Sequence, residues 1–598
     1  MSQSLKPIRY GWETIPWRKL EVKVFKLQKR IYQASLRGDV RLVHRLQRLL
    51  VKSWSAKVLA VRKVSQDNQG KKTAGVDGVK ALKPSERLEL VEKLEVKSSK
   101  KPTRRVWIPK PGTDEKRPLG IPVMWDRAVQ ALLKLVIEPE WEAKFEPNSY
   151  GFRPGRSAQD AIEAIHTAVC QKAKYVLDAD IAKCFDCINH QKLLAKLNTF
   201  PLFSRVIKQW LTSGVLDERK LFPTNEGTPQ GGVISPLLAN IALHGLEATI
   251  LDSFPNTKRI NGKYQSWKPQ VVRYADDFVI LHPNKTVIEE CKSIASKWLA
   301  ELDLELKPSK TRITHTLETI EGSETPGFDF LGFNIRSYRV GKNDSGKSNG
   351  VKLGFKTLIK PAKAKVKLHY QNLATHIDKM KGAPQERLIR DLNPAIIGWS
   401  NYYSTAVSKE SFSLLNTMMF SKLFSWARFR HPKKSKGWIA RKYWLINQGQ
   451  GWIFGTEKST LAKHGNIGIK RHVKVRGTAS PYDGNWTYWS QRRGSYPGIS
   501  RMVASALKRQ QGKCLECGLY FQPEDQIEIH HLDGNYRNNG KENLAALHRH
   551  CHDQTHGNRG NLSAQLSSHA KGQLGEEPDE RKLSRPVLKP SRVGDHPA

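Results

Sequence analysis

The chain has 598 residues, too many for a single hydrophobic core, and this length predicts three or more domains. Lys and Arg number 100 against 56 Asp and Glu, which gives a formal net charge of +44. Such an excess opposes compact folding unless a polyanion neutralises it, and nucleic acid is the natural polyanion. No apolar run approaches the roughly 20 residues that span a bilayer, and no signal peptide opens the chain, so we expect no membrane partner. The seven cysteines are an odd number and predict a reducing cytoplasm without a disulfide framework.

Residues 1–60 predict a basic, helical N-terminal extension. Val24, Leu27, Ile31 and Ala34 recur at helical spacing among lysines and arginines. A basic amphipathic helix can lie on a membrane or face RNA. The net charge of the whole chain favours RNA.

Residues 104–130 predict a hairpin with a tip rich in Pro and Gly. Cations project from this hairpin and from the loop that follows it. As single residues, each is an ordinary surface cation. As a set before the next predicted strand, they favour a clamp on a nucleoside triphosphate. They are Lys110, Lys116, Arg117, Arg153 and Arg156.

Two apolar stretches that end in carboxylates predict a metal site. In residues 175–186 the apolar run leads to Asp180, and in residues 271–281 Asp276 and Asp277 form the turn of a predicted hairpin. Adjacent carboxylates repel each other and gain nothing from burial unless a cation joins them. A solvated acidic turn is the alternative, which the apolar flanks disfavour. Two such strands side by side bring the three carboxylates together to hold two Mg²⁺ ions for phosphoryl transfer.

These two stretches resemble the palm motifs of reverse transcriptases, and residues 274–277 (YADD) match the core tetrapeptide of that family. The resemblance implies DNA synthesis from dNTPs on an RNA template. It also implies that Phe185 packs against the nucleotide sugar and excludes a 2′-hydroxyl; a core aromatic residue is the alternative. Gln230 and Gly231 lie in a glycine-rich stretch that closely matches the family motif contacting template and nucleotide. Lys310 lies in a later palm-like motif, where it meets triphosphate charge or is a surface cation.

Residues 392–403 (LNPAIIGWSNYY) resemble the thumb, or maturase domain, of reverse transcriptases encoded within group II introns, and we expect this domain to span 346–445. Residues 411–481 contain a single acidic residue, Glu457, while cations and aromatic residues interleave. This composition suits phosphate contact and base stacking on the intron RNA, although a charge run is usually a solvated face. The residues expected to make these contacts are Lys433, Lys434, Lys436, Trp438, Arg441, Lys442 and Trp444.

Nine Cys and His residues crowd the segment 514–556. Four of them form two spaced pairs that suit a structural, tetrahedral Zn²⁺, and a module this small needs such an ion to fold. These four are Cys514, Cys517, His548 and Cys551. A purely structural zinc ribbon is one reading of the segment, but it leaves the other histidines without a role.

The same constellation resembles the HNH endonucleases, which have a ββα-metal fold. The resemblance implies that His531 is the general base and that Asn543 orients it. It implies that His530, His552 and His556 hold a catalytic divalent ion. His548 stands where many relatives have Cys, which puts zinc affinity in doubt rather than the chemistry.

We therefore expect a multidomain α+β protein. A right-hand polymerase with fingers, a palm with an antiparallel sheet and an α-helical thumb precedes a small zinc-containing ββα-metal HNH module. The basic linker before this module is expected to let it fold on its own. The expected divisions are 1–60 N-terminal extension, 61–345 fingers and palm, 346–445 thumb, 446–505 basic DNA-binding linker, 506–560 HNH endonuclease and 561–598 disordered tail.

The resemblance covers nearly the whole chain, in the order of a bacterial group II intron-encoded protein. It implies reverse transcription, assistance to intron RNA splicing, and nicking of double-stranded target DNA during intron homing, in a cytoplasmic, nucleoid-associated protein. A splicing cofactor with a vestigial polymerase is one alternative, which the intact carboxylates and Phe185 disfavour. A retron-like or diversity-generating reverse transcriptase is the other, which the nuclease-like module and the thumb motif disfavour.

Overall fold

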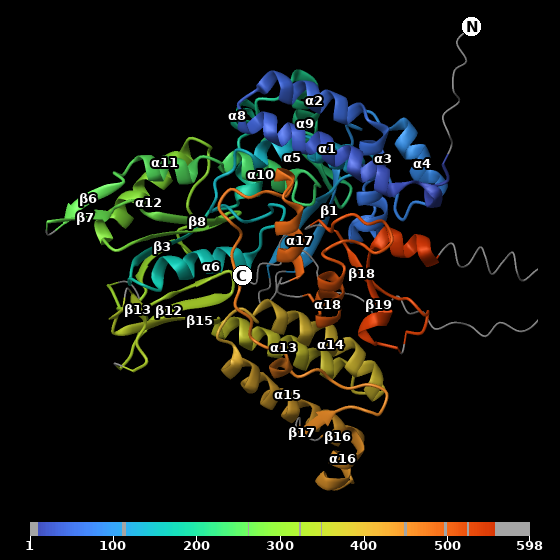
Figure 1. The fold of residues 1–598 in the computed structure, drawn as a ribbon, viewed down its shortest axis with the longest axis vertical. Coiled ribbons are helices and arrows are strands. Elements are labelled where there is room, and N and C mark those ends of the chain that lie inside the picture. The colour runs from blue at the N-terminus through green and yellow to red at the C-terminus, as the bar shows by residue number, and fades with distance from the viewer. Residues whose placement is uncertain are drawn as a thin grey trace, which may run out of the picture.

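The computed structural model describes residues 10–556, except 110–114, 261, 322–323, 342, 349, 448–450, 495–498, 523–524 and 537. Lys110 and the tail predicted to be disordered, residues 561–598, therefore lie outside the described residues. In Figure 1 the N-terminal helices and the sheet of β3 and β8 lie in an upper body, and a helical thumb that also carries β16 and β17 projects below it. No described helix is both long and apolar enough to cross a membrane.

A layer of N-terminal helices packs on the long helix α5. The layer consists of η1 (Trp12–Thr14), α1 (Trp17–Leu36), α2 (Val40–Lys52), α3 (Trp54–Arg62), η2 (Lys63–Asp67), η3 (Gln69–Lys72) and α4 (Pro84–Lys93), and α5 spans Met124–Glu142. The predicted apolar stripe of α1 is confirmed, because Val24, Ile31 and Ala34 are buried. Its apolar face therefore covers the protein core, while Lys19, Lys23 and Lys26 are exposed.

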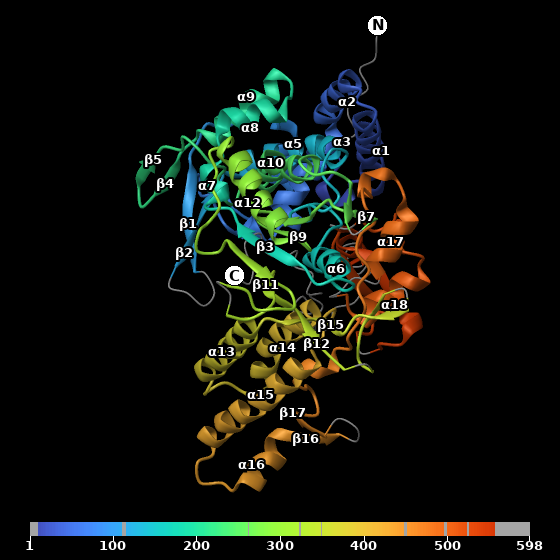
Figure 2. The ribbon, with the colours of Figure 1, turned by 90° about the vertical axis from the view of Figure 1, so that its left-hand side faces the viewer.

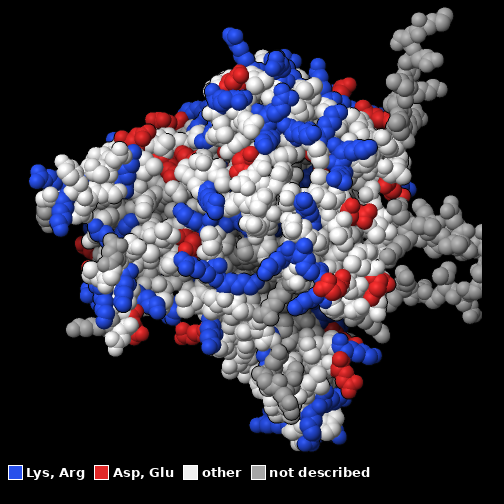
Figure 3. Space-filling view, in the orientation of Figure 1, with Lys and Arg blue, Asp and Glu red and all other residues white. Residues whose placement is uncertain are grey.

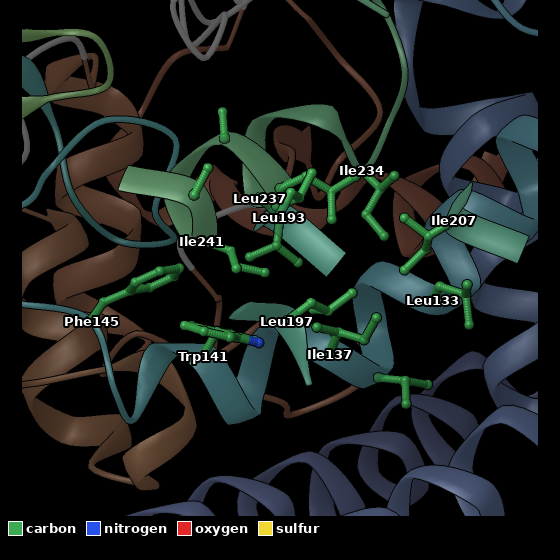
Figure 4. Close-up of a cluster of buried hydrophobic side chains, with 14 of the residues drawn as sticks. Leu133, Ile137, Trp141, Phe145, Leu193, Leu197, Ile207, Ile234, Leu237 and Ile241 are labelled. Atoms are coloured by element: carbon green, nitrogen blue, oxygen red, sulfur yellow. The ribbon is translucent and has the colours of Figure 1, made fainter. Parts of the chain in front are cut away.

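The core beneath this layer joins the N-terminal helices to the palm. Figure 4 shows Ile137 and Trp141 of α5 facing Leu197 and Ile241, which come from two later helices. Those helices and their neighbours are α7 (Cys184–Cys187), α8 (His190–Leu197), α9 (Pro201–Leu211), α10 (Ser235–Leu243) and α11 (Leu246–Asp252). One continuous core thus fixes the N-terminal segment to the body that carries the carboxylates.

The predicted fingers hairpin is confirmed as part of a four-stranded sheet. Its strands are β1 (Thr103–Pro109), β2 (Lys116–Ile121), β4 (Val215–Asp217) and β5 (Lys220–Phe222), in the order β2-β1-β4-β5. β1 and β2 are antiparallel and their last pair is Pro109 with Lys116. The tip between these two residues is the undescribed segment 110–114.

The palm sheet is antiparallel, as predicted, and both of its faces are covered. It consists of β10 (Arg312–His315), β3 (Tyr175–Asp180), β9 (Asp277–His282) and β8 (Gln270–Tyr274), in that order. Helix α6 (Ala158–Val169) packs on the face of Val272 and Val279, and α12 (Lys285–Ala300) packs on the face of Phe278 and Ile280. Burial on both faces explains why the strands read as nearly continuous apolar runs.

A smaller sheet leads from the palm into the thumb. It consists of β11 (Phe328–Phe330), β12 (Phe333–Arg339) and β15 (Phe355–Pro361), with a side hairpin of β13 (Lys347–Ser348) and β14 (Val351–Lys352). The thumb follows as α13 (Lys363–Lys379), α14 (Gln385–Tyr402), α15 (Lys409–Arg430), α16 (Lys436–Tyr443), β16 (Trp444–Asn447), β17 (Gly451–Phe454) and η4 (His464–Asn466). Figure 2 shows these helices below the palm sheet.

The C-terminal segment returns from the thumb to the upper body, as Figures 1 and 2 show. Its elements are η5 (Pro481–Asp483), α17 (Trp486–Gly494), α18 (Arg501–Arg509), β18 (Ile527–His531), η6 (Lys541–Asn543), β19 (Leu544–His548) and a helical stretch over 549–556. His472 and Arg492 both bond to the buried Asp160 of α6, and the Trp486 ring lies 4.2 Å from that of Phe25 in α1. The linker is therefore packed against the polymerase body, and independent folding of the last module stays a prediction.

Candidate active site and metal centres

The Asp pair lies at a tight hairpin at one end of the palm sheet. Tyr274 pairs with Asp277, so Ala275 and Asp276 make a two-residue turn, in which Ala275 has a φ of +58°. A positive φ is what such hairpin turns require. Asp180 ends the neighbouring strand and lies opposite Asp277 in the register. The structure therefore confirms the hairpin and places Asp180 next to Asp277 across the two strands.

The electrostatics of this cluster indicate a cation site. Burial, and then the charge of Asp180, raises the pKa of Asp276 to about 6. Burial, with the charges of Asp276 and Asp180, raises the pKa of Asp277 well above its usual value. Crowded carboxyl groups resist ionisation until a positive charge joins them. Their oxygen atoms are the donors that Mg²⁺ prefers, so the residues fit the predicted ions.

Two cations face the carboxylates. The Nζ atom of Lys310 lies 2.9 Å from Oδ2 of Asp180. Burial alone lowers the pKa of Lys310, but this ion pair and the two other carboxylates raise it overall. The charge of Arg117 lowers the pKa of Asp276, which places this fingers cation within electrostatic reach of the turn.

A buried arginine that precedes the turn fixes its position. Arg273 is 2% exposed, and its guanidinium donates to the carbonyl of Ala275 at 3.2 Å and to Oδ1 of Asn240 at 3.3 Å. Asn240 in turn donates to the carbonyl of Gly151 at 2.8 Å, and a Cβ on Gly151 would collide with the backbone of Ala275. These positioning residues were not predicted from the sequence, although an arginine inside an apolar strand was a signal.

The glycine-rich turn joins the fingers to the carboxylate strand. The amide of Gly120 in β2 donates to the carbonyl of Gln230 at 2.6 Å. Gly231 has a φ of +118°, and a Cβ there would lie 2.8 Å from the Gly120 oxygen. The half-buried Phe185 has its carbonyl bonded by the amide of Thr228 at the start of the same turn. The structure thus brings Gln230, Gly231 and Phe185 to one region between fingers and palm.

Two predicted clamp residues serve the fold instead. Arg153 is buried, and its guanidinium bonds to both oxygens of Glu142 at 2.9 Å. Arg156 is also buried and donates to the carbonyls of Pro147 and Gly477. The prediction of a triphosphate clamp is wrong for these two arginines, because their donors are used inside the protein. Glu142 ends α5 while Arg153 lies in the loop that follows, and Gly477 comes from the C-terminal linker, so sequence pattern alone did not show either pairing.

The four predicted zinc ligands come together in the C-terminal segment. One donor atom from each of Cys514, Cys517, His548 and Cys551 lies within 4.8 Å of the others. Nδ1 of His548 lies 3.3 Å from the Cys517 sulfur, and its Nε2 lies 3.3 Å from Oδ2 of Asp525. A carboxylate behind a histidine is the usual support of a metal ligand. The donor set therefore fits a tetrahedral Zn²⁺.

A second group of donors lies beside the first. Nitrogen atoms of His530, His552 and His556 also lie within 4.8 Å of one another. Burial, followed by the neighbouring histidines, lowers the pKa of His552 to about 4, which leaves it neutral and able to bind a metal at pH 7. Among the described residues these are the two groups of three or more donors this close together. The palm carboxylates are not so tightly grouped.

The strands β18 and β19 pair as an antiparallel hairpin that precedes the helical stretch 549–556. His531 ends β18, and its Nε2 lies 3.3 Å from Oδ1 of Asn539. The side chain of Asn543 bonds to Asp533 and to the carbonyl of Asn538. The hydrogen bonds of Asn543 therefore order the loop beside His531, whereas the side chain of His531 itself contacts Asn539 rather than Asn543, which was predicted to orient it.

This C-terminal module docks on the N-terminal helices. Gln554 donates to the carbonyls of Glu13 and Ile15, and Nε2 of His550 lies 3.7 Å from Oε1 of Glu21. Because His550 lies between two zinc-site ligands in the sequence, the interface and the metal site share one short segment.

Comparisons with known proteins agree with this geometry. Residues 108–335 match the reverse transcriptase (RNA-dependent DNA polymerase) model, residues 12–94 the N-terminal domain of reverse transcriptase, and residues 366–444 the maturase-specific domain of group II introns. Protein YkfC of Escherichia coli (strain K12) is 30% identical over 331 residues, 49% of this chain and 83% of YkfC. Group II intron-encoded protein LtrA of Lactococcus lactis subsp. cremoris is 27% identical over 519 residues, 74% of this chain and 82% of LtrA. The chain belongs to the group II intron reverse transcriptases.

The maturase domain of this group II intron reverse transcriptase exposes a basic surface around α16. Its exposed cations are Lys433, Lys434, Lys436, Arg441 and Lys442. The nitrogen atoms of two of these lysines lie 5.4 and 4.9 Å from the ring centre of Trp438. Trp444, in contrast, is 4% exposed and packs against Phe424 and Phe454. The prediction that Trp444 stacks on bases is therefore wrong.

Proposed function

We propose that this reverse transcriptase holds two Mg²⁺ ions with Asp180, Asp276 and Asp277. The observation that carries this proposal is the register that sets Asp180 opposite Asp277, one residue from Asp276 in the turn. Such ions, when bound, neutralise the triphosphate and activate the primer 3′-hydroxyl. The carboxylates supply the charge that fixes both ions, and Arg273 holds the turn so that this geometry is already formed before substrate binds.

The residues around the carboxylates then orient the nucleotide. Lys310 and Arg117 supply positive charge next to the triphosphate, and Lys110, in the undescribed tip, is proposed to add to it. Gln230 and Gly231 present bare backbone to the template and the incoming base. Phe185 packs against the sugar and leaves no room for a 2′-hydroxyl.

Reverse transcriptase and maturase activity in group II intron splicing follow from the family. We infer that the basic surface around α16 contacts the phosphates of the intron RNA. Neutralising Lys433, Lys434 and Lys436 removes three exposed charges without touching the thumb core. The expected result is a log–log salt slope for RNA binding that falls by roughly 0.7–0.9 per lost phosphate contact. An unaltered slope would show that these lysines only solvate the surface.

The C-terminal module is proposed to be an HNH endonuclease that nicks double-stranded target DNA for intron retrohoming. In this proposal His530, His552 and His556 hold the catalytic divalent ion, while the Cys₃His group holds a structural Zn²⁺. His531 takes the proton of the attacking water, and Asn543 orders the loop that carries His531. The support is a second donor group beside the zinc group, on two antiparallel strands followed by a helix.

Purified protein, a DNA primer annealed to RNA, dNTPs and Mg²⁺ provide the test of the polymerase. We expect extension that stops when the divalent ion is chelated. Tight RNA binding without any extension would instead support a splicing cofactor with a vestigial polymerase. A nicked-duplex assay with the same protein tests the nuclease separately.

A further inference from the structure

A two-stranded hairpin projects from the palm side of the molecule. It consists of β6 (Thr257–Ile260) and β7 (Lys263–Ser266), and Figure 1 shows it at the far left of the body. All but one of its eight strand residues are exposed. A two-stranded hairpin without cover is marginally stable in water, so this arm gains stability if a partner lies on it.

The arm carries positive charge that no neighbouring anion balances in the sequence. Residues 253–275 contain no Asp or Glu. Lys258, Arg259 and Lys263 are exposed, and Figure 3 shows blue side chains at this projecting end. The nearby helix α12 differs, because its Lys285 lies 3.6 Å from Glu289. Uncompensated cations on a projecting element favour a polyanion as the partner.

The register places cations and aromatic rings together. Arg259 pairs with Tyr264 across the two strands, so both side chains project from the same face. Tyr264 is 76% exposed, which is the highest exposed fraction among the described aromatic residues. On the other face, the Lys258 nitrogen lies 4.7 Å from the ring centre of Trp267. A free ring beside a cation is the arrangement that binds an unpaired base and its phosphate.

Single-stranded RNA fits this surface better than duplex DNA. A duplex offers phosphates, but its bases are stacked inside and leave the Tyr264 ring without a partner. The arm also lies away from the polymerase site, because it leads into β8 at Gln270, and the Asp276 turn follows the other end of that strand. The five extended residues of β8 separate the arm from the Asp276 turn by roughly 17 Å.

We propose that the β6–β7 hairpin is an RNA-contacting arm that holds an unpaired stretch of structured RNA outside the polymerase cleft. Lys258, Arg259 and Lys263 contact its phosphates, and Tyr264 stacks on one of its bases. The proposal rests on the RNA partner proposed above and adds a contact surface separate from α16.

The test uses the full-length protein and an RNA stem-loop with a ten-nucleotide loop as the probe. Binding is measured over a series of salt concentrations. The triple variant Lys258→Gln, Arg259→Gln, Lys263→Gln is expected to lower the log–log salt slope by about 2, which corresponds to three contacts to a single strand. The matched control changes Lys285, Lys292 and Lys297 of α12 to Gln. It removes the same charge from exposed positions and is expected to leave the slope unchanged.

Tyr264 separates base stacking from charge. Tyr264→Ala is expected to weaken RNA binding roughly 5- to 150-fold, while Tyr264→Phe keeps the ring and the affinity. Primer extension on a short template is expected to be unchanged in all arm variants, which also shows that they fold. A 20-base-pair DNA duplex is the comparison ligand.

The outcomes separate this proposal from the proposed function. If the wild-type protein does not bind the stem-loop, both fail. If it binds, but the arm variants match the α12 control, the arm proposal alone is overturned. If the arm variants lose affinity for the duplex and keep it for the stem-loop, the partner is duplex DNA and the proposal is likewise overturned.

Discussion

Replacing Gly231 with Ala tests whether the glycine-rich turn positions the substrate against the palm. Gly231 has a φ of +118°, and an added Cβ would lie 2.8 Å from the carbonyl oxygen of Gly120 in β2. Backbone held in such a region costs about 1–3 kcal/mol for a residue with a side chain. Since the contact atom is backbone, relief requires the turn to move away from β2. If the whole of this strain energy raises the free energy of the transition state, kcat/KM for the dNTP falls roughly 5- to 150-fold.

Single-nucleotide extension on an RNA template, at several dNTP concentrations, measures this change. Gly38→Ala is the matched control, because Gly38 also has a positive φ of +70° but nothing lies within 4 Å of an added Cβ. Gly38→Ala is expected to lose less thermal stability, because only its φ is strained, and to keep wild-type kcat/KM, whereas Gly231→Ala loses kcat/KM. Wild-type kinetics for Gly231→Ala would refute the idea that this turn positions template and nucleotide.

Three further predictions address the other proposed roles. Phe185→Ala is expected to admit ribonucleotides in single-nucleotide extension, and unchanged discrimination would show that the ring is only core packing. His531→Ala is expected to end DNA nicking while its zinc content stays normal. Cys517→Ala is expected to lose zinc and, because the module docks on α1, to increase hydrogen exchange in α1. Zinc loss in His531→Ala would contradict the assignment of base and ligands. The polymerase is expected to need more Mg²⁺ at pH 5.5 than at pH 7.5. The pKa of Asp276 is raised to about 6, so below pH 6 this carboxyl is largely protonated and cannot bind a cation. Equal Mg²⁺ requirements at the two pH values would contradict that reasoning.

Local pattern was enough to predict the hairpin at Asp276 and its neighbour strand at Asp180. Apolar flanks and adjacent charges are properties of a few consecutive residues, and burial of such a turn requires a partner for its charge. The spacing of Cys514 and Cys517, and of His548 and Cys551, likewise indicated a zinc-like group, because structural zinc ligands commonly come in closely spaced pairs. These features depend on chemistry that lies within reach along the chain.

Long-range packing accounts for what the sequence did not show. Arg153 looks like a free loop cation until Glu142, on α5, pairs with it. Asp160 and Arg492 are far apart in the chain, yet their ion pair docks the linker on α6. Trp444 belongs to a basic, aromatic stretch, but its ring fills the thumb core. In each case the partner belongs to another element of the fold, and periodicity carries no information about that pairing.

RNA-templated primer extension by the Asp276→Asn protein tests whether Asp180, Asp276 and Asp277 form the polymerase site. The amide is nearly isosteric with the carboxylate but removes one charge from the proposed metal site. We expect no extension above background, with RNA affinity and its salt dependence unchanged. Asp303→Asn, at an exposed turn where the side chain pairs with Lys192, is the matched control and is expected to extend normally. Near-normal extension by Asp276→Asn would contradict the assignment of Asp180, Asp276 and Asp277 as the polymerase site.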